Sequence, residues 1–448
     1  MKRLIKFLAF LILIVVAYYT YTTYPKLDIL SGFSSKSVAS HLFIAGRSQE
    51  ATEMEDNDVP SMNLAKNKVN DREKSVSSTA LGIKTRKAIY RRGVGVVVVP
   101  VNATIKQETY LAPNRERIPT NLTYPYGDLP QKDTLYSNID YKALMTSVND
   151  AFVDSELEVK KTRSVLVIYK DQIVAEQYTD GFDEKSLLLG WSMTKSVTSA
   201  VLGVMEKQGM VDLNEKNLFK EWEKDERKNI SLANLLNMNS GLEWEEDYTK
   251  ICDATKMLFL DSDMSTMQLE KSFVGTPNNT WNYSSGTTNL LSRYIRNQFK
   301  SQKEYLDFWY SDLIDKIGMH SMLIETDYSG NYVGSSYGWA TARDWAKFGL
   351  LYLHNGNWNG EQILNPSWID FTKKPTNGSN GVYGGHFWMN AGGKYPDVPK
   401  DMYSCNGFQG QRLYIIPSKD LVVLRTGLKG ESNFDVNNFL SNIINSIE

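Results

Sequence analysis

The order of strands and helices after Asp140 is the feature that most limits how this chain can fold. Two strand-like runs across a Lys-Asp turn come first, in "SVLVIYKDQIVAEQYTDGF". A mostly helical stretch follows. Strand-like runs "GGHFWMNAG" and "RLYIIPSKDLVVLRTG" then precede a last helix, "NFDVNNFLSNIINSIE". Since strands at the start and the end can pair, this order predicts an α+β fold. We expect an antiparallel, five-stranded type of sheet flanked by helices, with a largely helical inserted subdomain.

Composition divides the chain into three parts. Residues 1–25 are predicted to be an N-terminal signal anchor or signal peptide. Residues 26–135 are polar and Pro-containing, and predict an extension or linker with short strands, in "SVSSTALG" and "KAIYRRGVGVVVVP". Residues 136–448 are predicted to be one globular domain with its helical insert at about 212–335.

The N-terminus has the pattern of a membrane-directed segment. Lys2, Arg3 and Lys6 flank an apolar stretch that ends in a tyrosine-rich edge. The basic flank predicts a cytoplasmic start with the bulk of the chain outside, hence a bacterial inner-membrane protein with its main domain in the periplasm. The apolar core is short for a span, and no clear cleavage site precedes Pro25. Both a retained anchor that contacts the membrane and a cleaved signal with release into the periplasm therefore remain open.

Charge and metal-ligand content exclude several functions. The 448 residues include 50 Lys and Arg against 52 Asp and Glu, a net charge of −2, so nothing indicates a nucleic-acid partner. The two cysteines and four histidines show no metal-ligand spacing. We therefore predict neither a metal nor a cofactor.

Ser192 and Lys195 stand at the mouth of an apolar helix, in "GWSMTKSVTSAVLGVMEKQG". Residues three apart share one helix face, so the lysine lies beside the serine hydroxyl. A hydroxyl becomes a good nucleophile only when a neighbour takes its proton, and a lysine does so when burial lowers its pKa. The alternative is a helix cap followed by a surface lysine.

Four stretches extend this pattern in one consistent order. They are "LLLGWSMTKSVTSAVLGVMEKQGMVDLNEKN", "ISLANLLNMNSGLEWEEDY", "WNYSSG" and "GWATARDWAKFGLLYLHNG". From about Ser164 to the C-terminus the chain resembles the serine β-lactamase and penicillin-binding superfamily. The branch it resembles contains class C β-lactamases, esterases and 6-aminohexanoate-dimer hydrolases. The resemblance implies a β-lactamase/transpeptidase-like fold for the main domain.

The resemblance also implies roles for single residues. Ser192 is the expected nucleophile and Lys195 its base. Tyr283 is the expected proton relay, with its pKa lowered by the nearby ammonium group. Ser285 stands where the family usually has asparagine and is expected to bond Lys195. The alternative for Tyr283 is one more core or surface tyrosine.

The third family motif departs from the usual pattern. Its place is taken by "CNGFQGQRLYIIP", aligned so that Phe408, Gln409 and Gly410 stand where a cation is common. This puts β-lactamase and peptidase activity in doubt, since their substrates carry a carboxylate. Gln409 is a candidate to bond substrate. The backbone N–H groups of Gln411 and Ser192 are expected to form an oxyanion hole, with Gly410 permitting close approach.

The resemblance also bears on the cleft and on the two cysteines. Asp247 and Tyr248 resemble residues that line the cleft in the aminohexanoate-hydrolase subgroup; the alternative is a solvated acidic run. Cys252 and Cys405 stand on loops that this fold brings near the cleft, so an oxidising compartment would permit a disulfide.

The sequence as a whole therefore predicts a serine hydrolase that cleaves a small-molecule ester or amide through an acyl-enzyme on Ser192. One alternative is a β-lactamase or D,D-peptidase. The other is a non-catalytic, penicillin-binding-like sensor or scaffold.

Overall fold

The main sheet of the protein has seven antiparallel strands. The structure is a computed structural model that describes residues 2–101, 103, 110–115, 117, 120–155 and 158–447. The strands run in the order β12-β13-β14-β15-β16-β5-β6. Their bounds are Tyr383–Gly384, Phe387–Met389, Tyr403–Gly407, Gln411–Ile416, Leu421–Gly427, Thr162–Tyr169 and Gln172–Tyr178. The N-terminal pair β5–β6 adds directly to β16, which confirms the predicted α+β class. The sheet has seven strands and not the predicted five, because the short strands β12 and β13 pair at its edge beside β14.

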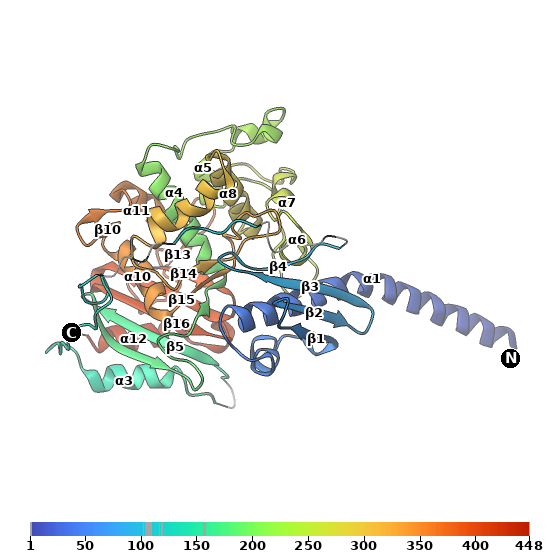
Figure 1. The fold of residues 1–448 in the computed structure, drawn as a ribbon, viewed down its shortest axis with the longest axis horizontal. Coiled ribbons are helices and arrows are strands. Elements are labelled where there is room, and N and C mark those ends of the chain that lie inside the picture. The colour runs from blue at the N-terminus through green and yellow to red at the C-terminus, as the bar shows by residue number, and fades with distance from the viewer. Residues whose placement is uncertain are drawn as a thin grey trace.

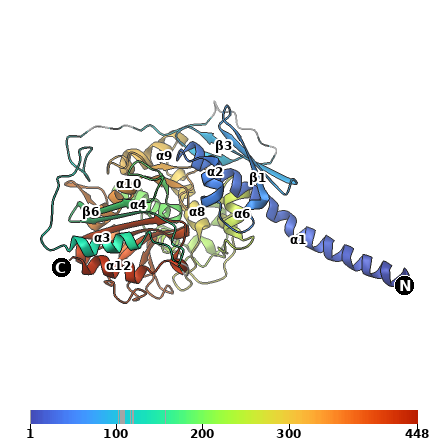
Figure 2. The same ribbon diagram turned by 90° about the horizontal axis from the view of Figure 1, so that it is seen from below.

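Helices cover both faces of this sheet (Figure 2). Alternate residues of β5 point to opposite sides, so Val165 and Val167 contact one core while Leu166 and Ile168 contact the other. Helices α3 (Tyr141–Asp150) and α12 (Val436–Asn445) lie on the first side. Helices α4 (Thr194–Lys207) and α10 (Ala342–Leu353) lie on the second.

The regular structure between α4 and α10 is mostly helical, in short helices separated by loops. Its helices are α5 (Leu232–Leu236), α6 (Asp253–Leu260), α7 (Thr266–Leu269), α8 (Ser285–Asn297) and α9 (Gln302–Trp309). A small sheet, in the order β7-β9-β8, joins this part to the main sheet; its strands are Leu188–Leu189, Gly338–Ala340 and Leu323–Ile324. A hairpin of β10 (Asn357–Trp358) and β11 (Glu361–Gln362) and helix α11 (Pro366–Lys373) follow α10.

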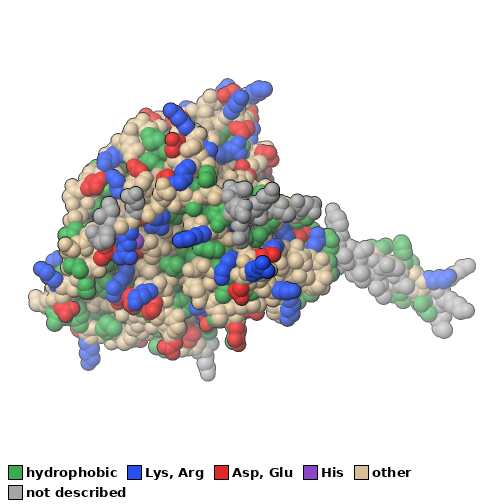
Figure 3. Space-filling view, viewed as in Figure 1, with side chains coloured by type: hydrophobic (Ala, Val, Ile, Leu, Met, Phe, Trp, Pro, Cys, Tyr) green, Lys and Arg blue, Asp and Glu red, His purple; other side chains and the backbone are tan. Residues whose placement is uncertain are grey.

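The N-terminal extension is a helix laid across a separate sheet (Figure 1). Helix α1 (Lys2–Phe43) packs on an antiparallel sheet, and the short helix α2 (Gln49–Ala51) follows it. The strands of that sheet are β1 (Ala65–Asn70), β2 (Ser75–Ala80), β3 (Lys84–Arg91) and β4 (Gly95–Val98). The first part of α1 projects from the body and exposes apolar side chains, such as Phe7 and Phe10 (Figures 1 and 3). Within the described residues, none of the helices has the length and apolar character needed to cross a bilayer.

The second half of α1 differs from the linker that its composition indicated. The polar residues there are largely serines, and Ser31 and Ser35 are buried because their hydroxyls donate to backbone carbonyls one turn earlier in the same helix. Small residues also let α1 approach α6 closely. A Cβ on Gly32 would lie 3.0 Å from Phe259 O.

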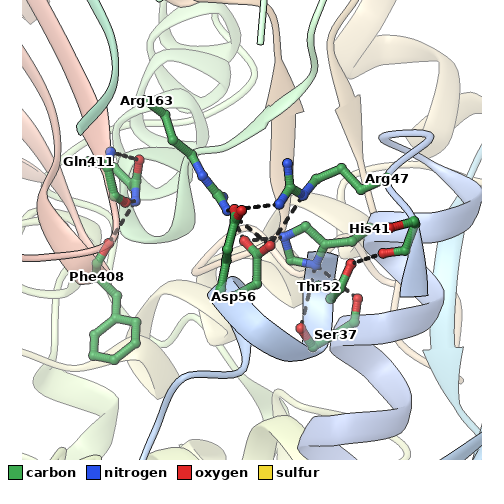
Figure 4. Close-up of polar contacts among 11 residues, drawn as sticks. Ser37, His41, Arg47, Thr52, Asp56, Arg163, Phe408 and Gln411 are labelled. Atoms are coloured by element: carbon green, nitrogen blue, oxygen red, sulfur yellow. Dashed lines mark hydrogen bonds and ion pairs between the residues drawn. The ribbon is translucent and has the colours of Figure 1, made fainter. Parts of the chain in front are cut away.

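Buried ion pairs join the extension to the main domain (Figure 4). Asp56 accepts hydrogen bonds from Arg163 at 2.6 and 3.0 Å, contacts His41 Nε2 at 2.9 Å, and accepts from Arg47 at 3.2 Å. Burial opposes ionisation of Asp56, but His41 and Arg163 outweigh it and hold the pKa of this carboxyl well below its usual range. This joint fixes the extension beside strand β5, where Arg163 stands.

A second buried pair joins α1 to the inserted part. Lys36 Nζ lies 2.7 Å from Glu325 Oε1, and both side chains are almost fully buried. Glu325 also accepts a hydrogen bond from Trp339 Nε1 at 2.9 Å. The ion pairs at Asp56 and at Glu325 thus hold α1 in one position.

Candidate active site

Ser192 stands on a tight turn that leads into α4. The turn, a 3₁₀ segment over Trp191–Met193, follows β7 directly. Trp191 has φ +47°, a left-handed conformation that is unfavourable for a side chain of this size. Such local strain is common where a fold presents a reactive side chain. Gly190 precedes it because a Cβ there would lie 2.3 Å from the Trp345 ring.

Lys195 lies next to the Ser192 hydroxyl, one helical turn away. Its Nζ is 2.9 Å from Ser192 Oγ, 2.8 Å from Ser285 Oγ and 2.8 Å from the Ser335 carbonyl oxygen. Burial lowers the pKa of Lys195 to about 8, although the negative charge of Glu246 raises it. A substantial share of Lys195 is therefore neutral at mildly alkaline pH and able to accept a proton. The structure brings together the two residues that the sequence paired.

Tyr283 completes a triangle with these two groups. Its phenol lies close enough to Ser192 for that residue to lower the pKa of the phenol, and Lys195 Nζ lies 4.9 Å from its ring centroid. Burial raises the pKa of Tyr283 well above its ordinary value, and Glu246 adds to this, although the Ser192 contact opposes it. The lowering of the Tyr283 pKa that was expected from the Lys195 ammonium group is not found. The phenol is therefore protonated in the free protein, a state from which it is able to donate a proton.

Glu246 is a site residue that the sequence reasoning missed. Its carboxylate accepts hydrogen bonds from Ser285 N and Ser285 Oγ at 2.7 Å each, from Trp244 Nε1 at 2.8 Å and from Tyr248 OH at 2.7 Å. Four donors hold one carboxylate next to the lysine. Its place in the acidic run "EWEEDY" was visible, but nothing in that run distinguishes which carboxylate turns inward.

The neighbouring Asp247 points elsewhere. Its carboxylate bonds Thr249 and lies 3.7 Å from Lys250, with a half-exposed side chain. Tyr248 does lie at the site, where its ring is 5.3 Å from that of Phe408. Of the two cleft residues predicted from the sequence, the structure thus brings only Tyr248 to the pocket that contains Ser192.

The third motif approaches the nucleophile through Gly407 and Phe408. A Cβ on Gly407 would lie 2.1 Å from the Gly190 carbonyl oxygen, so only glycine fits at the end of β14. Phe408, next in the chain, lies edge-to-face on Trp191 at 5.7 Å and lines the pocket at Ser192. The predicted alignment assigned this close approach to Gly410. In the structure Gly407, three residues earlier in the chain, contacts the nucleophile turn.

Gln409, Gly410 and Gln411 form the turn beyond this contact. Gln409 has φ +59°, and Gly410 has φ +84° with its carbonyl bonded by Arg425. The side chain of Gln411 donates to the carbonyl oxygens of Phe408 and Gly427 and is buried (Figure 4). The two glutamine side chains line a separate small cavity behind Trp191.

Arg412 supplies a positive charge that the motif alignment did not reveal. Its charge acts on Tyr283, where it tends to lower the pKa of the phenol. The guanidinium group donates to the carbonyl oxygens of Gly407 and Gln411, at 2.7 and 2.9 Å, and lies 3.4 Å from Glu431. Its place directly after the third motif was the signal available in the sequence.

The remaining candidates near the site are structural. His386 bonds the Leu236 carbonyl and Thr288, and burial lowers its pKa to about 3, so the ring is neutral. Cys252 and Cys405 are free and buried, which corrects the disulfide considered above. In the described part of the chain, no group of three His, Cys, Asp or Glu residues is arranged to hold a metal.

The antiparallel sheet flanked by helices is the fold of the β-lactamase and penicillin-binding superfamily, and the serine and lysine pair stands at the start of a buried helix. Residues 157–436 match the family model described as Beta-lactamase, and the chain belongs to that family, a family of hydrolases. The match covers more than half of the chain. The class C-like branch stays a prediction.

Solved structures show the same fold at low sequence identity. A protein assigned as a 6-aminohexanoate-dimer hydrolase from Bacillus anthracis is 23% identical, with a TM-score of 0.54 over 68% of this chain and 80% of that one. A family VIII carboxylesterase is 15% identical, with a TM-score of 0.53 over 68% and 96%. A penicillin-binding protein homologue from Caulobacter crescentus is 14% identical, with a TM-score of 0.52 over 69% and 96%. No curated protein sequence matches the chain.

Proposed function

We propose that this protein is a serine hydrolase that cleaves a small-molecule ester or amide through an acyl-enzyme on Ser192. The observation that carries the proposal is the 2.9 Å contact between Ser192 Oγ and Lys195 Nζ, together with the lysine pKa of about 8. A buried amine that titrates near neutrality is suited to general-base work.

The geometry supports a two-step reaction. Neutral Lys195 accepts the Ser192 proton while Oγ attacks the substrate carbonyl carbon and its oxygen becomes an oxyanion. As the carbonyl re-forms, the bond to the leaving oxygen or nitrogen breaks and that atom takes a proton through Tyr283. Water then attacks the carbonyl carbon of the acyl-enzyme. The same groups, Lys195 and Tyr283, accept the proton of the water and return one to Ser192 Oγ, and the acid and free Ser192 are released.

Backbone N–H groups are proposed to stabilise the oxyanion. Ser192 N is one candidate. Phe408 N is the nearer second candidate, because Gly407 before it contacts the nucleophile turn. The Gln411 N–H group, expected from the sequence, lies beyond the turn, and its role stays a prediction.

A β-lactamase or D,D-peptidase needs a cation free to bind the substrate carboxylate. Arg412 is the cation near Tyr283, but two backbone carbonyls and Glu431 already accept from it. We therefore favour a neutral substrate. Incubation with a penicillin should give no stable or turned-over acyl-enzyme by mass spectrometry, whereas a p-nitrophenyl ester should be hydrolysed.

The central experiment compares Ser192→Ala and Lys195→Ala with Lys207→Ala, an exposed lysine at the end of the same helix. We expect the first two to lose about 10⁴-fold or more in kcat/KM, since residues of such a unit act together. A fluorophosphonate should label Ser192 in the unchanged protein and in Lys207→Ala. Absence of both labelling and turnover would favour the non-catalytic sensor or scaffold instead.

We also retain the proposal of an inner-membrane position with the main domain in the periplasm. It depends on the basic and apolar pattern of residues 1–25. Fractionation of producing bacteria tests it. Protein that stays in the membrane pellet after carbonate washing indicates a retained anchor. Periplasmic protein with a shortened N-terminus indicates a cleaved signal, and cytoplasmic protein of full length contradicts the proposal.

A further inference from the structure

The cavity that contains Ser192 is shared between the main domain and the N-terminal extension. It has a volume of about 250 Å³. One wall consists of the nucleophile turn and helix α6. The opposite wall comes from α1 and the segment that precedes β1. Its apolar lining includes Ile29, Leu30, Phe33, Met62, Leu258 and Phe408.

The wall supplied by α1 is fixed in place. Phe33 packs edge-to-face on Phe259 of α6, with ring centroids 5.4 Å apart. One turn further along, Lys36 forms its buried pair with Glu325. The joint at Asp56 holds the end of the extension segment that returns toward the cavity (Figure 4). A cavity with fixed walls selects its occupant by shape and polarity.

The polarity of the cavity fits an uncharged apolar group. Most of the lining is aliphatic or aromatic, and the two lysines that border it, Lys26 and Lys250, are exposed. Lys250 is already paired with Glu245. Ser192 thus borders a hydrophobic pocket.

The position of the proton relay shows which part of the substrate occupies this pocket. Lys195 and Tyr283 do not line it, and Tyr283 instead packs against Tyr383 and Trp388. The leaving group needs a proton from that relay, so it departs on the side of Tyr283. The acyl group is left to extend into the apolar cavity.

We propose that the extension makes this protein selective for unbranched acyl chains of about six to eight carbons, since a chain atom occupies about the volume of a water molecule, about 30 Å³. This rests on the proposed function, because it requires an acyl-enzyme on Ser192. Helix α1 acts as the substrate-selecting wall.

The test is a series of p-nitrophenyl esters from acetate to dodecanoate, hydrolysed by the full chain. Because the leaving group is constant, kcat/KM reports on the acyl chain alone. We expect it to rise about fourfold per methylene, as burial of apolar groups predicts, up to about eight carbons and then to stop rising. A profile that is flat or falls from acetate onward overturns the inference.

Two variants test whether the preference for longer acyl chains comes from the extension. Leu30→Trp and Met62→Trp fill the cavity from separate segments, and Leu129→Trp is the control at an exposed leucine outside it. The octanoate-to-acetate ratio of kcat/KM should fall tenfold or more in the first two and stay unchanged in the control. An unchanged ratio in both filling variants overturns the assignment to α1.

The same assay distinguishes failure of the acyl pocket from failure of the proposed hydrolase function. Acetate turnover and fluorophosphonate labelling of Ser192 with no chain-length preference overturn the acyl pocket and leave the proposed function intact. Absence of turnover and labelling with every probe overturns both.

Discussion

Glu246 lies one hydroxyl group away from Lys195. Ser285 Oγ accepts a hydrogen bond from Lys195 Nζ at 2.8 Å and donates one to Glu246 Oε1 at 2.7 Å. A negative charge next to a buried amine stabilises its protonated form. The carboxylate therefore offsets part of the lowering of the Lys195 pKa by burial, and its removal should leave more of the lysine neutral at a given pH.

The pH profile should report this link. For a neutral ester, kcat/KM should rise with pH through an apparent pKa of about 8, as Lys195 loses its proton. Glu246→Gln removes the charge that raises the pKa of Lys195, so the rise should move to lower pH. Glu243→Gln, at an exposed position nearby, is the control and should leave the midpoint in place. A midpoint that is the same in all three proteins contradicts this role for Glu246.

The loss of kcat/KM on removal of the Tyr283 hydroxyl should depend on the leaving group of the substrate. Burial keeps this phenol protonated, and its proposed task is to pass a proton to the departing atom. Tyr283→Phe should therefore cost on the order of 10²-fold or more in kcat/KM for an alkyl ester or an amide. A p-nitrophenyl ester, whose leaving group departs as an anion, should lose less than about tenfold. Tyr294→Phe, which removes a hydroxyl bonded to Glu215, is the control; equal losses for both substrates would argue against a relay.

Gly407 should tolerate no side chain. Its Cβ would lie 2.1 Å from the Gly190 carbonyl oxygen, so Gly407→Ala has to shift either β14 or the nucleophile turn. We expect kcat/KM to fall about 10²-fold, since a displacement near 1 Å has that effect on a positioned nucleophile. In Gly430→Ala the nearest atom to the new Cβ is 3.9 Å away, and activity should stay within about twofold. Full activity of Gly407→Ala would show that the contact is not needed.

The joint between the extension and the main domain should depend on the charge of Asp56. Asp56→Asn leaves Arg163 and Arg47 without their buried partner and should reduce the free energy of unfolding by about 3 kcal/mol. Asp58→Asn, which removes an exposed partner of Lys161, should cost less than about 1 kcal/mol. Urea denaturation measures both, and limited proteolysis shows whether α1 is released first. Similar losses in the two variants would contradict a specific role for the buried joint.

The same joint predicts a stability change in acid. The pKa of Asp56 is lower in the folded protein than in the unfolded chain. Its contribution to stability is therefore complete above the unfolded value of about 3.9 and is lost as the pH falls through the folded value. Asp56→Asn should show a weaker dependence of unfolding free energy on pH below about 4 than the unchanged protein. An identical acid dependence in the two proteins would exclude Asp56 as its source.

The sequence by itself determined the parts that depend on local spacing. A strand pair, a helical middle and further strands near the C-terminus were enough for the fold class, because strand and helix periodicities are visible along the chain. The short edge strands β12 and β13 raised the strand number of the main sheet to seven. The three-residue spacing of Ser192 and Lys195 predicted their contact for the same reason. Tyr283 came from resemblance, and the structure places it in that triangle.

Only the tertiary structure decided which residues from distant segments meet at the serine. Glu246 turns inward and Asp247 outward, although they are neighbours in an acidic run, because the four donors that fix Glu246 come from Trp244, Tyr248 and the start of α8. Ile29 and Leu30 reach the cavity because α1 docks on α6 through Phe33 and Gly32. Contacts between different elements, such as Glu246 with the start of α8 or α1 with α6, leave no periodic pattern in a single sequence. Packing of the whole chain is what brings such side chains together.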